Sequence, residues 1–172
     1  IVACYFTYLP WNMDRLNIDE SDVSIFLIIF GLFFILSNQI CSRILVPKYG
    51  TKIIMCIAII IIAISNLLLM MSPSYFYLLL FAIPTGIGWG SSAPIAGIHA
   101  NLIEKHSGKI VVPYYAMGFN LGMFVGGICA GIFINYQFTP KYVFSILIII
   151  SFLISLVIYN FALPNNLDFK GK

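Results

Sequence analysis

The sequence contains no charged residue from position 53 to position 98, and this run constrains the fold more than any other feature. About 20 apolar residues in a helix cross the hydrocarbon core of a bilayer, so the run is too long for one span. The tripeptide Ser72-Pro73-Ser74 interrupts it, and both residue types favour a turn at this point. The run therefore predicts two transmembrane helices, over residues 53–71 and 75–101.

Other apolar runs predict helices over residues 20–45, 110–135 and 142–163, and part of a helix over about residues 1–12. Only 9% of the residues are charged and 61% are hydrophobic, whereas an ordinary soluble domain is about 25% charged. This composition excludes a soluble enzyme and a nucleic-acid-binding protein, and the runs lack the alternation of transmembrane β-strands. The predicted fold class is all-α, a polytopic transmembrane helix bundle with five full spans and a truncated first helix. We therefore expect a piece of a longer protein.

The basic residues fall unequally on the two sides of the predicted bundle. Only Arg15 and Lys141 lie in the loops of one side, and the other seven of the nine lie on the opposite side: Arg43, Lys48, Lys52, Lys105, Lys109, Lys170 and Lys172. Cytoplasmic loops of membrane proteins carry the excess of lysine and arginine. The distribution predicts that the C-terminus is cytoplasmic, with a linker beginning over residues 164–172.

Glycines recur at every fourth position on two predicted helices. Gly118, Gly122 and Gly126 form one such series, and Gly86 and Gly90 form another. Small residues four apart lie on one helix face and let a neighbouring backbone approach closely. We expect both series to be helix-packing surfaces.

Two segments contain candidate substrate contacts. The segment from Pro84 to Pro94 concentrates prolines, glycines and hydroxyl residues, including Trp89 and Ser91, in the middle of a span. It is either a broken helix that binds a substrate, as in transporters, or a kinked packing helix. Tyr5 and Tyr8 near the end of the first helix belong either to an interfacial aromatic belt or to a cavity mouth. We take Tyr5, Tyr8, Trp89 and Ser91 as the candidate substrate pathway.

Apart from tyrosines and cysteines, whose ordinary pKa values are too high, His99 is the titratable residue nearest the membrane core. It is either a proton relay, because the ordinary pKa of histidine is about 6.5, or a hydrogen-bonding group at the membrane interface. The sequence contains no nucleotide-binding, zinc-protease or serine-hydrolase motif. It therefore predicts no cofactor, no metal site and no enzymatic activity.

Several segments together resemble the major facilitator superfamily of transporters. Residues 8–16 and 19–34 are similar to the end of helix 1, the first external loop and helix 2 of that superfamily. The next loop resembles its cytoplasmic signature G-x-x-x-D-R-x-G-R-R. Lys48, Gly50 and Lys52 match its basic and glycine positions, whereas Arg43 replaces the first glycine and Pro47 replaces the acid.

The second part of the chain carries the same resemblance. Residues 86–90, 120–122 and 126–127 are similar to helices 4 and 5 of the bacterial fucose-permease-like subset. Ser91 stands where some relatives carry a carboxylate that couples transport to protons or binds sugar.

The resemblance implies the N-terminal half, from the end of helix 1 to helix 6, of a fold with two six-helix halves and the substrate between them. The implied function is a secondary transporter that moves a small solute by alternating access in the bacterial inner membrane. The implied partners are the solute, the lipid bilayer and the missing C-terminal half. Two alternatives remain from the residues themselves: a small transporter or channel that self-assembles, and an integral membrane enzyme acting on lipids.

Overall fold

The computed structural model describes residues 1–162, and every regular element among them is helical. The elements in chain order are α1 (Val2–Leu16), α2 (Glu20–Ile40), the π-helical turn η1 (Cys41–Leu45), α3 (Val46–Tyr49), α4 (Thr51–Met71), α5 (Tyr75–Ser107), α6 (Val112–Asn135) and α7 (Pro140–Phe161). Five helical segments within this part are long and apolar enough to cross a membrane, and α2, η1 and α3 together form one of them. The predicted all-α, polytopic membrane fold is confirmed.

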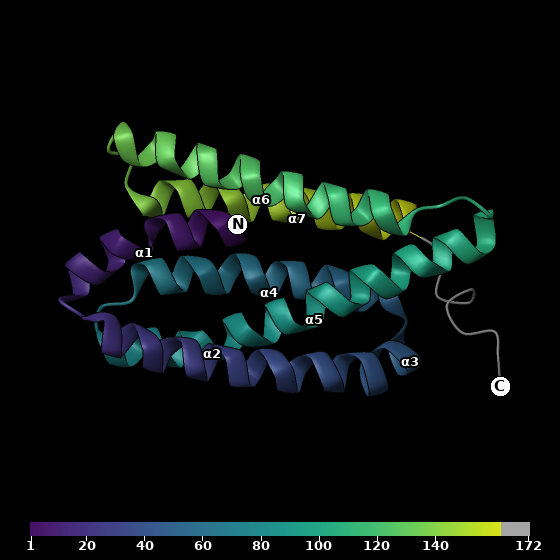
Figure 1. Ribbon diagram of the computed structural model, residues 1–172, viewed down its shortest axis with the longest axis horizontal. Helices are drawn as coiled ribbons and strands as arrows, with labels where there is room; N and C mark the ends of the chain where they lie inside the picture. The colour runs from purple at the N-terminus through teal and green to yellow at the C-terminus, as the bar shows by residue number, and fades with distance from the viewer. Residues whose placement is uncertain (163–172) are drawn as a thin grey trace.

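The helices run along the long axis of the molecule, as Figure 1 shows. Helix α5 packs against α2 and α4, α4 also packs against α7, and α1 packs against α6. The turns at residues 17–19, 72–74 and 136–139 lie at one end of the bundle, which we call the Asn17 end. Gly50 and residues 108–111 lie at the other end, which we call the Gly50 end.

Local sequence explains where the first helix ends and the second begins. Helix α1 continues to Leu16, beyond its predicted end at about residue 12, because Asn17 adopts the left-handed conformation (φ 52°) and ends it there. Asp19 then caps α2: its carboxylate accepts a hydrogen bond from the N–H of Asp22 at 2.9 Å, and the carboxylate of Asp22 accepts one from the N–H of Asp19 at 3.4 Å. This reciprocal pairing is a capping box.

The second span also extends beyond its predicted end at residue 45. In the turn η1 the N–H of Val46 donates to the carbonyl of Cys41, and the helix then continues through Pro47, which occupies the first turn of α3. Gly50 ends it with φ 82°, a conformation that residues with a side chain rarely adopt. Helix α4 therefore starts at Thr51, two residues before its predicted start.

The end of α5 and the start of α7 also differ from their predicted positions. Helix α5 continues to Ser107, past the predicted residue 101, and ends where Gly108 adopts φ 67°. Pro84 and Pro94 lie inside this continuous helix, so of the two alternatives for this segment the span is not a broken helix. Helix α7 starts at Pro140. Its predicted last residue, 163, and the predicted linker over residues 164–172 lie outside the described residues.

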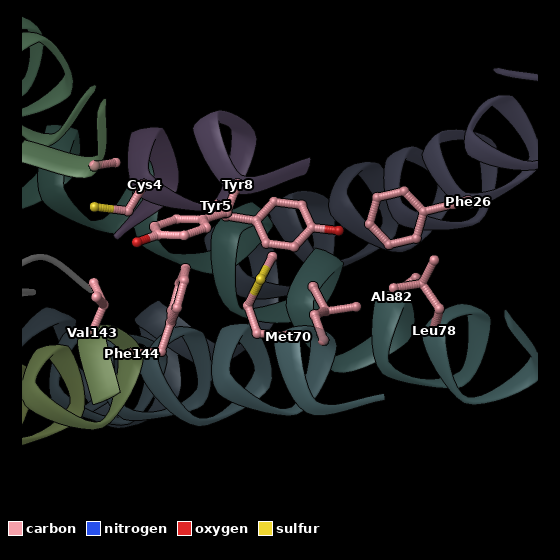
Figure 2. Close-up of a cluster of buried hydrophobic side chains, with 11 residues drawn as sticks. Cys4, Tyr5, Tyr8, Phe26, Met70, Leu78, Ala82, Val143 and Phe144 are labelled. Carbon is pink, nitrogen blue, oxygen red and sulfur yellow. The ribbon is translucent and has the colours of Figure 1, made fainter. Parts of the chain in front are cut away.

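The main core lies toward the Asn17 end, where Tyr5, Tyr8, Phe26 and Phe144 are all buried. Figure 2 shows the rings of Tyr5 and Tyr8 extending from α1 in different directions. The ring of Tyr5 lies 6.0 Å from that of Phe26 on α2, and the ring of Tyr8 lies 6.1 Å from that of Phe144 on α7. These two tyrosines therefore connect α1 to both sides of the bundle.

Candidate functional site

A small cavity lies between α1, α2 and α5, and its walls are mainly aromatic. Its volume is about 10 Å³, and it is lined by Tyr5, Phe6, Phe26, Leu27, Phe30, Thr85 and Trp89. The ring of Trp89 meets Phe6 at 5.7 Å and Phe30 at 5.2 Å, both edge to face, which is a favoured geometry for aromatic pairs. The cavity has room for about one water molecule.

Two residues that line this cavity carry a buried polar atom with no hydrogen-bond partner. Among the described residues, three buried side-chain polar atoms lack one: the Tyr5 hydroxyl, Trp89 Nε1 and Asn66 Oδ1. The first two belong to cavity residues, whose side chains are 2% and 9% exposed. Such a group costs about 1–3 kcal/mol when left unsatisfied. The surface of the closed cavity is apolar, so these two groups become available to a bound molecule only when their side chains turn toward it.

The third polar group of the cavity is the hydroxyl of Thr85. It donates to the carbonyl of Phe81 at 2.7 Å and keeps its capacity to accept. The remaining lining residues are apolar, and no Asp, Glu, Lys, Arg or His side chain lines this cavity. The closed cavity therefore presents an apolar, aromatic surface, and its lining residues Tyr5, Thr85 and Trp89 carry hydrogen-bonding groups behind that surface.

Ser91, which was expected in the substrate pathway beside Trp89, does not line this cavity. Its hydroxyl lies 2.6 Å from the hydroxyl of Ser37 and 2.7 Å from the carbonyl of Ile87. Trp89 and Ser91 both contact α2, Trp89 at Phe30 beside the cavity and Ser91 at Ser37 outside it. The interpretation of a packing contact, which the sequence also allowed, fits Ser91.

Tyr8 also lies outside the aromatic cavity. Its hydroxyl donates to the carbonyl of Phe138 at 3.3 Å, and it lines a separate hollow of about 170 Å³ at the Asn17 end together with Trp11 and Gln137. The structure thus separates the four candidate residues into three places, and only Tyr5 and Trp89 share a cavity.

A buried polar network at the Asn17 end was missed from the sequence. Arg15 donates to Asn12 Oδ1 at 2.7 Å and to the Ser72 hydroxyl at 3.2 Å. Asn12 and Ser72 are both fully buried, and both donate to the carbonyl of Leu69. The network connects α1 to the turn between α4 and α5. The available signal was the position of Asn12, which is on the same helix face as Tyr5 and Tyr8.

His99 lies at the other end of α5, near the loop that resembles the cytoplasmic signature. It is 7% exposed, and its Nδ1 is 2.8 Å from the hydroxyl of Thr51, the residue after Gly50. Ten residues separate His99 from Trp89, which is about 15 Å along a helix. The contact therefore belongs to the packing of α4 on α5 and is remote from the aromatic cavity.

The basic residues of that loop have different surroundings. The ammonium of Lys48 lies 5.1 Å from the ring of its neighbour Tyr49, and that of Lys52 lies 4.9 Å from the ring of Tyr159 on α7. Arg43 is exposed on η1. The loop thus presents cations at the surface of the Gly50 end.

The two glycine series have different roles. A Cβ added at Gly86 would lie 2.5 Å from the carbonyl oxygen of Phe30, and one at Gly90 would overlap the backbone of Phe34. These glycines therefore allow α5 to pack tightly on α2.

The series on α6 does not behave as expected. A Cβ at Gly118 or Gly122 would meet nothing within 4 Å, and one at Gly126 would only touch Ala3 at an ordinary 3.4 Å. Within residues 1–162 no backbone approaches Gly118 or Gly122 closely. Gly122 instead borders a hollow of about 690 Å³ between α6, α1 and α7, which Cys4 and Gly126 also line.

Comparison with known proteins identifies one family. Residues 1–168 match the family model of the Major Facilitator Superfamily. No curated protein is similar enough in sequence to count as a relative. The family match covers all five candidate membrane spans of the described residues and α1, including the aromatic cavity and the loop at Gly50.

Proposed function

The chain belongs to the Major Facilitator Superfamily, whose members are transporters and not enzymes, and on this premise we propose that it carries a small, uncharged solute by alternating access. We place part of the solute site at the cavity of Tyr5 and Trp89. One observation carries this proposal: two residues that line the same aromatic cavity, Tyr5 on α1 and Trp89 on α5, each hold a buried polar atom without a hydrogen-bond partner. A solute with hydrogen-bond acceptors and an apolar face satisfies both donors.

The neutral charge of the solute follows from the lining of the cavity. Transfer of an unpaired charge into an apolar site costs far more free energy than one hydrogen bond returns. The cavity residues offer no ionic partner, so a charged solute is disfavoured there. Because a volume of about 10 Å³ holds only a water, the solute enters when Phe6 and Phe30 move away from Trp89.

We further propose that a second six-helix half completes the pathway on the open side of α6. The absence of a described neighbour at Gly118 and Gly122 supports this arrangement. The unequal distribution of basic residues supports a cytoplasmic C-terminus. The similarity of residues 86–90 to the fucose-permease-like subset supports a bacterial inner membrane. If the protein instead builds its pathway by self-assembly, crosslinking in membranes will give oligomers through α6.

The direct test removes one donor at a time from the full-length protein. A panel of neutral, cationic and anionic solutes is first screened by thermal shift, and the affinity of the best solute is then measured for Tyr5→Phe and Trp89→Phe. We expect the dissociation constant to rise about three- to tenfold in each variant, because each substitution removes one hydrogen bond to the solute. The melting temperature without solute should stay the same or rise for Tyr5→Phe, because an unsatisfied buried hydroxyl has been removed.

Two control variants distinguish this result from general damage. Tyr77→Phe removes an exposed hydroxyl from the same helix as Trp89, and Ser91→Ala removes a hydroxyl from the contact with α2. Both should leave the affinity for solute unchanged. The proposal is wrong if only charged solutes bind, or if Tyr5→Phe and Trp89→Phe bind the solute as tightly as Tyr77→Phe does.

A further inference from the structure

A second hollow lies on the outside of the bundle, between α4 and α7. This groove has a volume of about 300 Å³, and its lining includes Ile60, Ala63, Ile64, Ile148, Ile149 and Phe152. Ser151 also borders it, but its hydroxyl donates to the carbonyl of Leu147 at 2.7 Å. In a membrane-spanning bundle, a groove without polar groups is filled by hydrocarbon, since an empty groove loses dispersion contacts.

A cation lies on the same two helices, beyond the groove toward the Gly50 end. On α4, Lys52 precedes Ile60 by eight residues, which is about 12 Å along the helix. Its ammonium lies 4.9 Å from the ring of Tyr159 on α7. Between this pair and the groove, the thiol of Cys56 donates to the carbonyl of Ser155 at 3.4 Å and holds the two helices together. The cation, the aromatic ring and the apolar groove therefore lie along one seam of α4 and α7.

Carboxylates do not neutralise Lys52 among the described residues. Four of the acids, Asp14, Asp19, Glu20 and Asp22, lie at the Asn17 end of the bundle. Glu104 is the described acid at the Gly50 end, and its carboxylate accepts hydrogen bonds from the backbone N–H groups of Val111 at 2.9 Å and Val112 at 3.1 Å. Arg43 and Lys48 are exposed at the same end, so this end attracts anions.

We propose that the seam of α4 and α7 binds one anionic phospholipid. Its phosphate lies at the ammonium of Lys52, the ring of Tyr159 lies at the level of the interface, where tyrosine is favoured, and one acyl chain fills the groove from Ile60 to Ile64. These groove residues are about 12–18 Å from Lys52 along α4. Half of a hydrocarbon core is about 15 Å thick, so an acyl chain attached at the headgroup reaches this depth. The site is independent of the solute cavity.

The test compares two lipids with identical acyl chains on delipidated full-length protein. Dioleoyl phosphatidylglycerol is anionic and dioleoyl phosphatidylcholine is zwitterionic, and native mass spectrometry measures the occupancy of each. We expect Lys52→Gln to weaken phosphatidylglycerol binding about fivefold, the worth of one basic residue at an anionic surface, and to leave phosphatidylcholine binding unchanged. Lys52→Arg, which keeps the charge, should restore most of the preference.

Two further variants test the parts of the proposed site separately. Lys141→Gln removes a basic residue from the opposite end of α7 and should change neither affinity. Ile149→Trp fills the groove and should weaken the binding of both lipids. The proposal is overturned if Lys52→Gln and Lys141→Gln behave alike, or if Ile149→Trp binds phosphatidylglycerol normally. It is also overturned if soluble glycerol phosphate competes as well as the lipid does, because the chain would then contribute nothing.

Discussion

The glycines of α5 and those of α6 have the same four-residue spacing and opposite surroundings. The backbone of α2 lies so close to Gly86 and Gly90 that neither position has room for a methyl group. Gly118 and Gly122 have open space on the corresponding side of α6. Glycine spacing therefore identifies a face that a backbone could approach, but it does not identify which helix approaches it.

The glycine-bearing faces of α5 and α6 also differ in the hydrogen bonds that they make to neighbouring helices. The close approach of α5 to α2 lets the Ser37 hydroxyl reach both the carbonyl of Ile87, at 2.9 Å, and the hydroxyl of Ser91, at 2.6 Å. On α6, the thiol of Cys4 donates to the carbonyl of Gly126 at 3.3 Å, and at the first turn the N–H of Val112 donates to the carboxylate of Glu104 on α5 at 3.1 Å. The glycine face of α5 thus stabilises this bundle. We propose that the glycine face of α6 packs against the second six-helix half.

The largest effect is expected from a methyl group on the tight face. Gly90→Ala places a Cβ inside the backbone of Phe34, so α2 and α5 must separate and lose their shared contacts. Overpacking of this kind costs about 1–3 kcal/mol, and a rigid backbone neighbour places it at the upper end. We expect a large fall in the melting temperature, measured by circular dichroism in detergent.

Gly97→Ala is the matched control for that experiment, because it lies on the same helix and a Cβ there meets nothing within 4 Å. Its melting temperature should equal or exceed that of the unsubstituted protein, since alanine favours helix over glycine. Equal stability of the two variants would show that the contact at Gly90 relaxes without cost.

A smaller and different effect is expected from the open face. Gly122→Leu should leave the melting temperature of the described bundle nearly unchanged, because the new side chain enters open space. It should nevertheless reduce transport by the full-length protein in proteoliposomes, since a leucine separates α6 from a helix that packs there. Normal transport by this variant would mean that the α6 face has no close partner. Unfolding as severe as that of Gly90→Ala would mean that the face is packed within this bundle.

The spans could be predicted from the sequence because apolar length, prolines and turn residues act locally. The predicted helix ends were too early where the helix continues past its first polar residues to a residue with positive φ. Asn17 ends α1 in this way and Gly108 ends α5. Contacts between helices could not be predicted in the same way, because they depend on how each helix is rotated. Trp89 and Ser91, for example, both contact α2, but only Trp89 lines the cavity.

The smallest effect is expected at His99, which lies on the packed side of α5 but far from the cavity. Its Nδ1 is 2.8 Å from the Thr51 hydroxyl, and the amide of His99→Gln can make a similar hydrogen bond. We therefore expect a loss of stability of about 1 kcal/mol or less, with solute exchange unchanged. We also expect solute accumulation driven by an imposed pH gradient, if the protein shows any, to persist. Thr51→Val removes the partner hydroxyl and should give the same result. If His99→Gln keeps exchange and loses gradient-driven accumulation while Thr51→Val keeps both, His99 carries the coupling proton, and its role extends beyond packing α5 against α4.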